Sequence, residues 1–513
     1  MAMKLNDQLF DLIKSLTKSE KRTFKIYAKR QQGDSDLKFL LLFDSLDKMA
    51  EYDENLILKK NSGIKKAQLS NLKAHLYKQI LTSLRLVQIN YNKDIEIREQ
   101  IDYAKILFNK GLYKQSLKLL DRIKSQSERY NLDLLTLDII EFEKLIESRY
   151  ITRSIKERAN LLTAQSSYIN ESIDLRGKLS NLALRLYGLY IKVGYVRNEK
   201  DYLMVKHFFH SNLPKVALNE MGFYQRLYFY QSYVWYYYIV QDFTQCYRSA
   251  QKWVDLFEEY PEMKKEESGG YMKGLHNLLA ALFNILHYDK FKHYVEVLDA
   301  FIKDNEKQFS DNFKIQAIIY SETNKINLYF MEGRFSDGVI HVPDILTRVG
   351  EYKDKIDQHR IITIYYKIAC LYFGAEEYKK SIKYLNEIIN LKVGPLREDI
   401  HCFARILSLI AHFELKNDDL LEYQIKSVYR FLLKMEDMHL VQKEIFMFLR
   451  KSMNVKRSNL KPYFQDLLIK LNEIQRDQYE RRPFLYLDVI SWLESKIFQI
   501  PVQKVIRDKF LGR

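Results

Sequence analysis

Two stretches of the chain, AKILFNKGLYKQSLKLLDRI at residues 104–123 and ACLYFGAEEYKKSIKYLNEI at residues 369–388, carry one spacing of small, aromatic and apolar residues. Each opens with alanine and has a tyrosine nine positions later, a serine three positions after the tyrosine, and apolar residues four and seven positions after the serine. Residues three and four positions apart share one face of an α-helix. Each stretch therefore predicts two helices that approach each other most closely at the alanine and the serine.

Weaker copies of this pattern lie between the two stretches. Phe243, Phe291 and Phe335 occupy the aromatic position ahead of Tyr378, at separations of 48, 44 and 43 residues. A period of this size is typical of stacked helical repeats. Extended toward the N-terminus, it places further copies near residues 202, 157 and 113, which predicts about eight helical hairpins.

The order of small, aromatic, small and apolar residues resembles the tetratricopeptide (TPR) repeat, in the longer form found in TPR-like superhelices of some bacterial regulators. The resemblance covers residues 94–435 and implies an all-α, right-handed superhelix with helical caps at both ends. We therefore expect a basic helical cap domain at 1–93, the repeats at 94–435, and C-terminal capping helices with a basic tail at 436–513. A non-repetitive helical array is the alternative.

The composition agrees with an all-helical fold. The chain has 16 glycines and 7 prolines in 513 residues, well below the usual shares of about 7% and about 5%. Tight hairpins and glycine-rich phosphate loops depend on these residues, and the sequence has no nucleotide-binding glycine motif. The one glycine cluster, at residues 268–274, follows several glutamates, and we expect it to be a loop ahead of a helix.

Three features point to a cytoplasmic protein. The three cysteines are too widely spaced for a disulfide framework or a zinc site. Charges at Asp7, Asp11 and Lys14 interrupt the N-terminal apolar residues, so we expect no signal peptide. The most apolar stretch, residues 227–240, is shorter than the roughly 20 residues of a membrane span.

The resemblance also implies a binding groove. In TPR folds the first helix of each repeat lines a concave surface, at fixed offsets before the aromatic residue that begins the second helix. Tyrosine and tryptophan dominate binding hot spots, so we predict a non-enzymatic scaffold or adaptor that binds a peptide or a helical segment of another protein. A wide aromatic packing core is the alternative. Counted from Phe243, Phe335 and Tyr378, the groove residues are Tyr228, Gln231, Trp235, Tyr238, Tyr320, Asn327, Phe330, Thr363, Tyr366 and Phe373.

The N-terminal segment carries much of the chain's net charge of +16. Between residues 55 and 93 there is no aspartate or glutamate, and the pattern predicts helices at about 36–50 and 67–87, a short apolar segment at 56–60 and a turn at Gly63. This layout favours, as a second function, a transcriptional regulator whose N-terminal helices contact DNA or RNA. Another acidic partner, or a merely solvated lysine-rich face, are the alternatives. The candidate contact residues are Lys59, Lys60, Lys65, Lys66, Lys73 and Lys78.

The remaining candidates indicate packing. His207 and His210 share a helical face without a third ligand nearby, and Cys246 and Cys370 fall at packing positions, so we predict no metal site, no cofactor and no enzymatic activity. An enzyme would need ionisable groups gathered from distant parts of the chain. The apolar run at 484–494, which follows Arg481-Arg482-Pro483, is expected to cap the last repeat, ahead of a basic tail that ends at Arg513.

Overall fold

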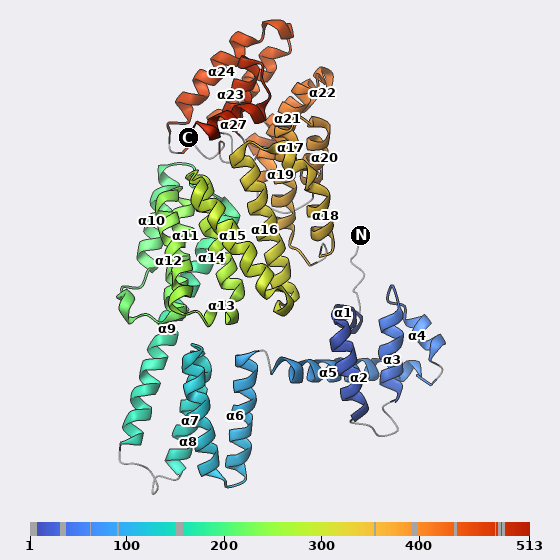
Figure 1. Cartoon of the computed structure of the whole chain (residues 1–513), viewed down its shortest axis with the longest axis vertical. Coiled ribbons are helices and arrows are strands. Elements are labelled where there is room, and N and C mark those ends of the chain that lie inside the picture. The colour runs from blue at the N-terminus through green and yellow to red at the C-terminus, as the bar shows by residue number, and fades with distance from the viewer. Residues whose placement is uncertain are drawn as a thin grey trace. The chain divides into compact units, whose positions relative to one another are not determined.

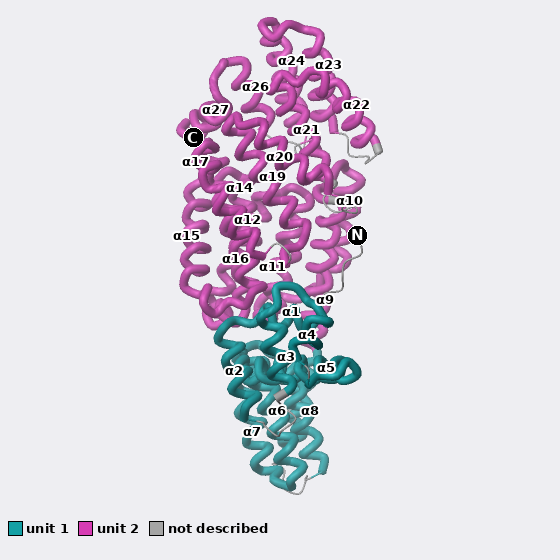
Figure 2. Tube along the Cα trace, turned by 90° about the vertical axis from the view of Figure 1, so that its right-hand side faces the viewer, with its two compact units in different colours: residues 1–170 teal, residues 171–513 magenta. Residues whose placement is uncertain are grey.

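A computed structural model describes residues 8–30, 37–61, 63–89, 92–149, 157–352, 355–391, 398–434, 439–477, 479–480, 484 and 488–512. Every regular element in these residues is a helix (Figure 1), so the predicted all-α class is confirmed. The chain divides into two compact units, Met1–Asn170 and Glu171–Arg513 (Figure 2). The first unit contains the predicted cap domain together with the first of the predicted repeats.

The first unit has two apolar cores. One lies among α1 to α5 and includes Phe24, Phe43 and Leu76. The other lies among α6 to α8 and includes Ile101 and Ile139. The predicted helix at 67–87 and the segment at 56–60 correspond to α5 and α4. The helices are α1 (Gln8–Ser15), α2 (Lys18–Arg30), α3 (Leu37–Lys48), α4 (Glu54–Lys60), α5 (Lys66–Gln88), α6 (Lys93–Asn109), α7 (Tyr113–Arg129), α8 (Asp133–Arg149) and α9 (Arg158–Val193), which continues into the second unit.

In the second unit most helices pack against their neighbours in the chain, as α11 does on α12, α14 on α15, and α19 on α20. None of the helices in the described part of the chain is long and apolar enough to cross a membrane. The helices are α10 (Glu199–Asn212), α11 (Phe223–Ile239), α12 (Phe243–Glu259), α13 (Met263–Glu266), α14 (Ser268–Asn284), α15 (Tyr288–Asn305), α16 (Asp311–Glu332), α17 (Phe335–Ile340), α18 (Val342–Gly350), α19 (Gln358–Gly374), α20 (Tyr378–Ile389), α21 (Glu398–Glu414), α22 (Asp418–Lys434), α23 (Leu440–Ser452), α24 (Lys461–Ile474), α26 (Val489–Phe498) and α27 (Val502–Leu511).

The two opening stretches of sequence form the same contact. The Ser116 hydroxyl donates to the Ala104 carbonyl at 2.8 Å, and the Ser381 hydroxyl donates to the Ala369 carbonyl at 2.9 Å. All four residues are fully buried. Cys246 makes the corresponding contact in the α11–α12 pair, with its Sγ 3.7 Å from the carbonyl oxygen of Val234. The predicted close approach of the helices at the alanine and the serine is confirmed.

Seven turns between consecutive helices of the described residues share one backbone conformation. A residue with positive φ stands two positions before the following helix, and the next N–H donates to the carbonyl five positions back, at 2.8–3.1 Å. This is the Schellman arrangement, which satisfies carbonyls left open at a helix end. Five of the seven residues are not glycine, so the motif is hard to predict from residue type. The residues are Gly111, Asn131, Gln241, Leu286, Gly333, Glu376 and Lys416.

One of these positions offers a gain in stability. Lys416 is exposed and has a φ of 59°, a conformation that costs an L-residue roughly 1–2 kcal/mol. We expect Lys416→Gly to raise the free energy of unfolding by about 0.5–1 kcal/mol, measured by chemical denaturation. Lys252→Gly, at an exposed interior position of α12, should instead lower it by about 1 kcal/mol. Equal losses at both positions would contradict the expectation.

The expected loop at residues 268–274 is wrong, because these residues begin α14. Gly274 faces Trp253, and two atoms of the indole ring lie 3.0 Å from the place that a Cβ would take. Trp253 is one of the two largest fully buried side chains in the described residues, the other being Trp492. The glycine therefore provides the space in which α12 packs its tryptophan against α14.

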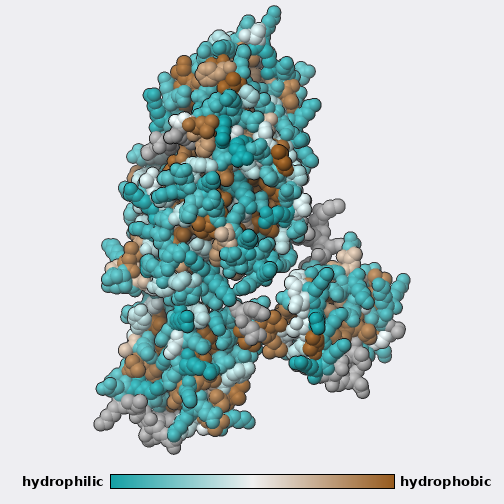
Figure 3. Space-filling view, viewed as in Figure 1, coloured by the Kyte–Doolittle hydropathy of each residue, from teal (hydrophilic) through white to brown (hydrophobic). Residues whose placement is uncertain are grey.

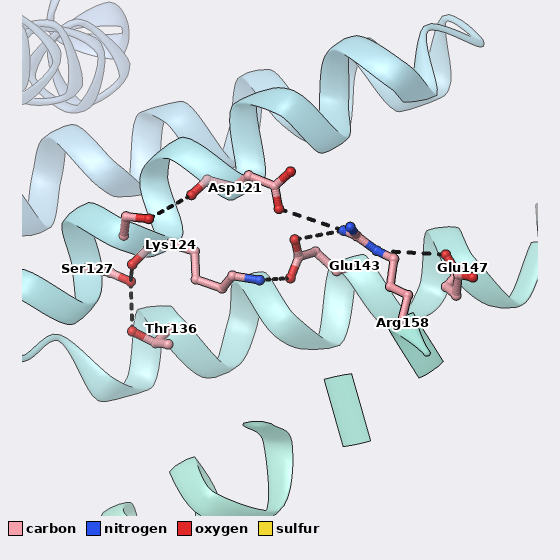
Figure 4. A network of polar contacts seen from close by, with 8 residues as sticks. Asp121, Lys124, Ser127, Thr136, Glu143, Glu147 and Arg158 are labelled. Atoms are coloured by element: carbon pink, nitrogen blue, oxygen red, sulfur yellow. Dashed lines mark hydrogen bonds and ion pairs between the residues drawn. The ribbon is translucent and has the colours of Figure 1, made fainter. Parts of the chain in front are cut away.

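Five ionisable side chains meet among α7, α8 and α9 in the first unit (Figure 4). The fully buried Glu143 carboxylate lies 2.6 Å from the Lys124 ammonium group and 3.2 Å from the Arg158 guanidinium. Asp121 and Glu147 lie 3.7 and 3.9 Å from the same guanidinium. Burial raises the pKa of Glu143, and the charges of Lys124 and Arg158 oppose that rise without cancelling it. The network thus holds the Glu143 carboxyl group in the interior, where its ionised form costs free energy.

Removal of one cation should make this cost measurable. Lys124→Met leaves Glu143 with Arg158 as its positive partner and should lower the free energy of unfolding by about 1–3 kcal/mol at pH 8. A carboxyl group whose folded pKa is raised binds more protons folded than unfolded, so its contribution to stability falls as pH rises from the unfolded toward the folded pKa. The loss should therefore be smaller at pH 5 than at pH 8 in denaturation experiments. As a control, Lys118→Met, at an exposed position of α7, should have a free energy of unfolding within about 0.5 kcal/mol of wild type. A loss of stability in Lys124→Met that is the same at pH 5 and pH 8 would contradict the expectation.

The C-terminal helices contact parts of the second unit that are far apart in sequence. In α26 the Trp492 indole N–H donates to Glu414 at 2.7 Å. In α27 the Arg507 guanidinium donates to the Glu332 carbonyl at 3.1 Å, and Gln503 accepts from the Ser336 hydroxyl at 2.9 Å. The segment therefore packs on both α21 and the end of α16. Arg481, Arg482, Pro483, residues 485–487 and Arg513 lie outside the described residues.

Candidate functional site

The second unit contains a cavity of about 1950 Å³. A typical pocket for a small organic ligand has roughly 300–1,000 Å³, so this cavity has room for a longer ligand. Its wall comes mainly from α11, α14, α16 and α19, the first helices of successive pairs, with side chains from α9, α10, α24, α26 and α27. The C-terminal segment is thus part of the wall.

Eight of the ten predicted groove residues line this one cavity: Trp235, Tyr238, Tyr320, Asn327, Phe330, Thr363, Tyr366 and Phe373. The other two, Tyr228 and Gln231, lie nearer the start of α11, outside the lining. Tyr228 packs against the main apolar core, and Gln231 is buried. Residues at the predicted offsets therefore line the cavity on α16, on α19 and on the C-terminal half of α11.

The sequence prediction missed the contribution of α14. It took Phe291 as the aromatic residue that begins the second helix, whereas α15 begins at Tyr288. Both residues fit the period, since Tyr288 lies 45 residues after Phe243 and 47 before Phe335. Offsets of 15, 12, 8 and 5 residues counted back from Tyr288 give four residues that all line the cavity: Lys273, His276, Ala280 and Phe283.

Aromatic rings form a continuous part of the wall. The Trp235 ring lies 4.8 Å from Tyr187 and 5.5 Å from Tyr190, measured between ring centroids. Tyr238 meets the edge of Tyr190 at 5.4 Å. Such packing fixes the ring positions before a ligand arrives, and it presents a large apolar surface with little rotamer entropy to lose on binding.

Another part of the cavity wall is polar, because basic and amide side chains of α14, α16 and α19 line it. Lys273, Arg360 and Lys367 all line the cavity, with His276, Asn277 and Asn327 between them. The Lys367 ammonium group donates to the Asn327 Oδ1 at 2.6 Å. Burial, together with the charges of Lys367, Arg360 and Lys273, lowers the pKa of His276 to about 3. The imidazole is therefore neutral at physiological pH, in a field set by three cations.

Histidine and cysteine side chains of the described residues also line the cavity. No three histidine, cysteine or acidic side chains there gather in a way that could hold a metal ion. Cys370 lines the cavity, but burial raises the pKa of its thiol to about 12, which keeps it protonated and poorly nucleophilic. His207 contacts Ser211 at 3.5 Å in α10 and is exposed.

The six candidate lysines of the N-terminal segment divide into two groups. Lys73 is half-buried and donates to the Tyr52 hydroxyl at 2.8 Å. The others are exposed and form no ion pair with a carboxylate in the described part of the chain: Lys59, Lys60, Lys65, Lys66 and Lys78. Lysines of α2 behave differently, since Lys21 and Lys25 pair with Asp47 and Asp44 at 2.6 Å.

On the face drawn in Figure 3, apolar residues form small separate patches in a hydrophilic surface.

Comparison of the chain with protein-family models, curated proteins and solved structures finds no match. The functional conclusion therefore depends on the geometry of the cavity and the charge of its lining.

Proposed function

We propose that this chain is a TPR-like protein-binding scaffold or adaptor whose cavity holds a peptide or helical segment of another protein, without catalysis. In this proposal the helix pairs form a right-handed superhelix of about eight hairpins, capped at both ends. The recurring Schellman turns and the two serine–alanine contacts support it, because each places the same backbone geometry at corresponding points of different helix pairs. Localisation in the cytoplasm is part of the proposal.

The single observation that carries the proposal is the convergence of eight predicted groove residues from three helices on one cavity. Aromatic side chains supply contact area for a ligand, and they are ordered before binding. Asn277, Asn327, Thr323 and Thr363 add donors and acceptors that suit a peptide backbone. The volume of about 1950 Å³ also suits a chain segment better than a single small molecule.

Affinity selection tests this proposal. Full-length protein is incubated with a soluble library of random octapeptides, and the retained peptides are identified by mass spectrometry. Thr363→Trp fills part of the cavity and should reduce retention at least tenfold, whereas Thr347→Trp, at an exposed position of α18 outside the lining, should leave it unchanged. Retention that is indifferent to Thr363→Trp, or no retention by wild type, would overturn the proposal.

A second candidate function follows from the five exposed lysines, which have no acidic partner in the described residues. A nucleic-acid-associated regulator would use them to contact phosphates. Binding of the full chain to a 30-base-pair duplex should then weaken about 100-fold between 50 and 200 mM salt. Lys59→Gln/Lys60→Gln/Lys65→Gln/Lys66→Gln should flatten that dependence. Binding that the fourfold variant leaves unchanged would exclude this surface.

A further inference from the structure

Lys273 occupies an unusual position in the cavity wall. It projects from α14 and is half-buried. Its ammonium group stands over the rings of Tyr187 and Trp235, 5.3 and 5.8 Å from their centroids. No carboxylate of the described residues forms an ion pair with it. The ring faces supply a weak attraction, which leaves the charge of this lysine largely uncompensated.

Several other half-buried basic side chains of the same unit are ion-paired. Arg226 lies 2.6 Å from Glu259, Lys264 lies 2.7 Å from Glu258, and Lys496 lies 2.8 Å from Glu414. A charge withdrawn from water is normally compensated in this way. Lys273 has no carboxylate ion pair among the described residues, which is also true of Arg176 and Arg405, but of these three only Lys273 lines the cavity.

Neighbouring charges strengthen the positive field instead of neutralising it. Burial lowers the pKa of Lys273, and the charge of Arg360 lowers it further. Arg360 itself lies 3.2 Å from Asp357, whose side chain is about half exposed, so that pairing is partly screened by water. An anion placed near Lys273 would interact favourably with all three cations of the lining.

The carboxylates of the lining are engaged elsewhere. Asp242 and Asp488 accept N–H groups at the starts of α12 and α26, and Glu199 lies in the first turn of α10. They serve helix ends, and none of them forms an ion pair with Lys273. Within the described part of the chain, Lys273 thus has no carboxylate as counter-ion.

We propose that the peptide held in the cavity presents a carboxylate to Lys273, with Arg360 and Lys367 adding to its attraction and an apolar or aromatic neighbour packing on the Tyr187–Trp235 wall. This inference rests on the proposed function and names the class of its ligand, an acidic peptide. The anionic groups of an unmodified peptide are the carboxylates of aspartate, glutamate and the chain end, so the ligand anion comes from one of these.

The test uses full-length protein and two octapeptide libraries, one with free C-terminal carboxylates and one with amidated C-termini. If a side chain supplies the anion, the peptides that wild type retains from the amidated library should be at least threefold enriched in aspartate and glutamate. Retention confined to the free-carboxylate library would assign the anion to the chain end. Either pattern supports the proposal.

Variants then locate the site. Lys273→Met should weaken binding of the selected peptides at least tenfold, whereas Lys303→Met, at an exposed position of α15 outside the lining, should not. The wild-type enrichment does not depend on whether Lys273→Met folds. Retained peptides of neutral composition, bound equally by Lys273→Met, would overturn this inference and leave the proposed function standing. Failure of wild type to retain any peptide would overturn both.

Discussion

Replacing Gly333 with alanine is expected to release α27 from the end of α16 and to lower the free energy of unfolding by about 3–4 kcal/mol. Gly333 is buried and has a φ of 65°. A Cβ at this position would lie 2.5 Å from the Arg507 backbone nitrogen and 2.9 Å from the Gln503 carbonyl oxygen. Backbone atoms cannot rotate away as a side chain can, so the helix itself has to move.

Two measurements check this expectation. Hydrogen exchange should become faster at the amides of residues 502–511, and chemical denaturation should show the loss of stability. Gly350→Ala serves as the control, because Gly350 is exposed and no heavy atom lies within 4 Å of its added Cβ; it should change stability by less than about 0.5 kcal/mol. Unchanged exchange in α27 of Gly333→Ala would contradict the docking described above.

Gly374→Ala is expected to lower the free energy of unfolding by about 2–3 kcal/mol, through overpacking. Gly374 ends α19, and an added Cβ would overlap ring carbons of Phe335, the first residue of α17. Phe335 is one of the aromatic residues that define the sequence period, so this contact joins two successive helix pairs.

A double-mutant cycle isolates the contact. Phe335→Ala should lower the cost of Gly374→Ala by about 1–2 kcal/mol, because the atoms that the added methyl group would overlap are then absent. Gly188→Ala, at an exposed position of α9 with nothing within 4 Å of the added Cβ, should raise stability by about 0.5–1 kcal/mol. If the losses of stability from the two substitutions simply add, the Phe335 ring does not contact a side chain at position 374, and the expectation is contradicted.

Much of the fold was predictable because its signals are local. The helical period, the scarcity of glycine and proline, and the small residues Ala104, Ser116, Ala369 and Ser381 all act within one helix pair. The Schellman turns were not predictable in the same way. Most of their left-handed positions are occupied by residues such as Leu286 and Glu376, which carry no sequence signal for positive φ.

The cavity was predictable where the repeat offsets held. They identified α16 and α19 well, but a three-residue error in the anchor of the α14 pair concealed Lys273 and His276. Side chains from α9 and from the C-terminal helices escaped prediction for another reason. Their place in the wall depends on packing between segments outside a single helix pair, such as Gln503 with Ser336, which are 167 residues apart; a repeat pattern does not encode such contacts.

Photo-crosslinking tests the central claim, that the cavity of the second unit is the binding site. Benzoylphenylalanine is placed at Phe283 or Phe330, both in the cavity lining, or at Tyr423 on α22, which is 70% exposed and outside the lining. The full-length variants are irradiated with the peptides retained by wild type, and the adducts are mapped by mass spectrometry. Adducts at Phe283 and Phe330 and none at Tyr423 are the predicted result. Adducts at Tyr423 with none at the two cavity positions would contradict the assignment.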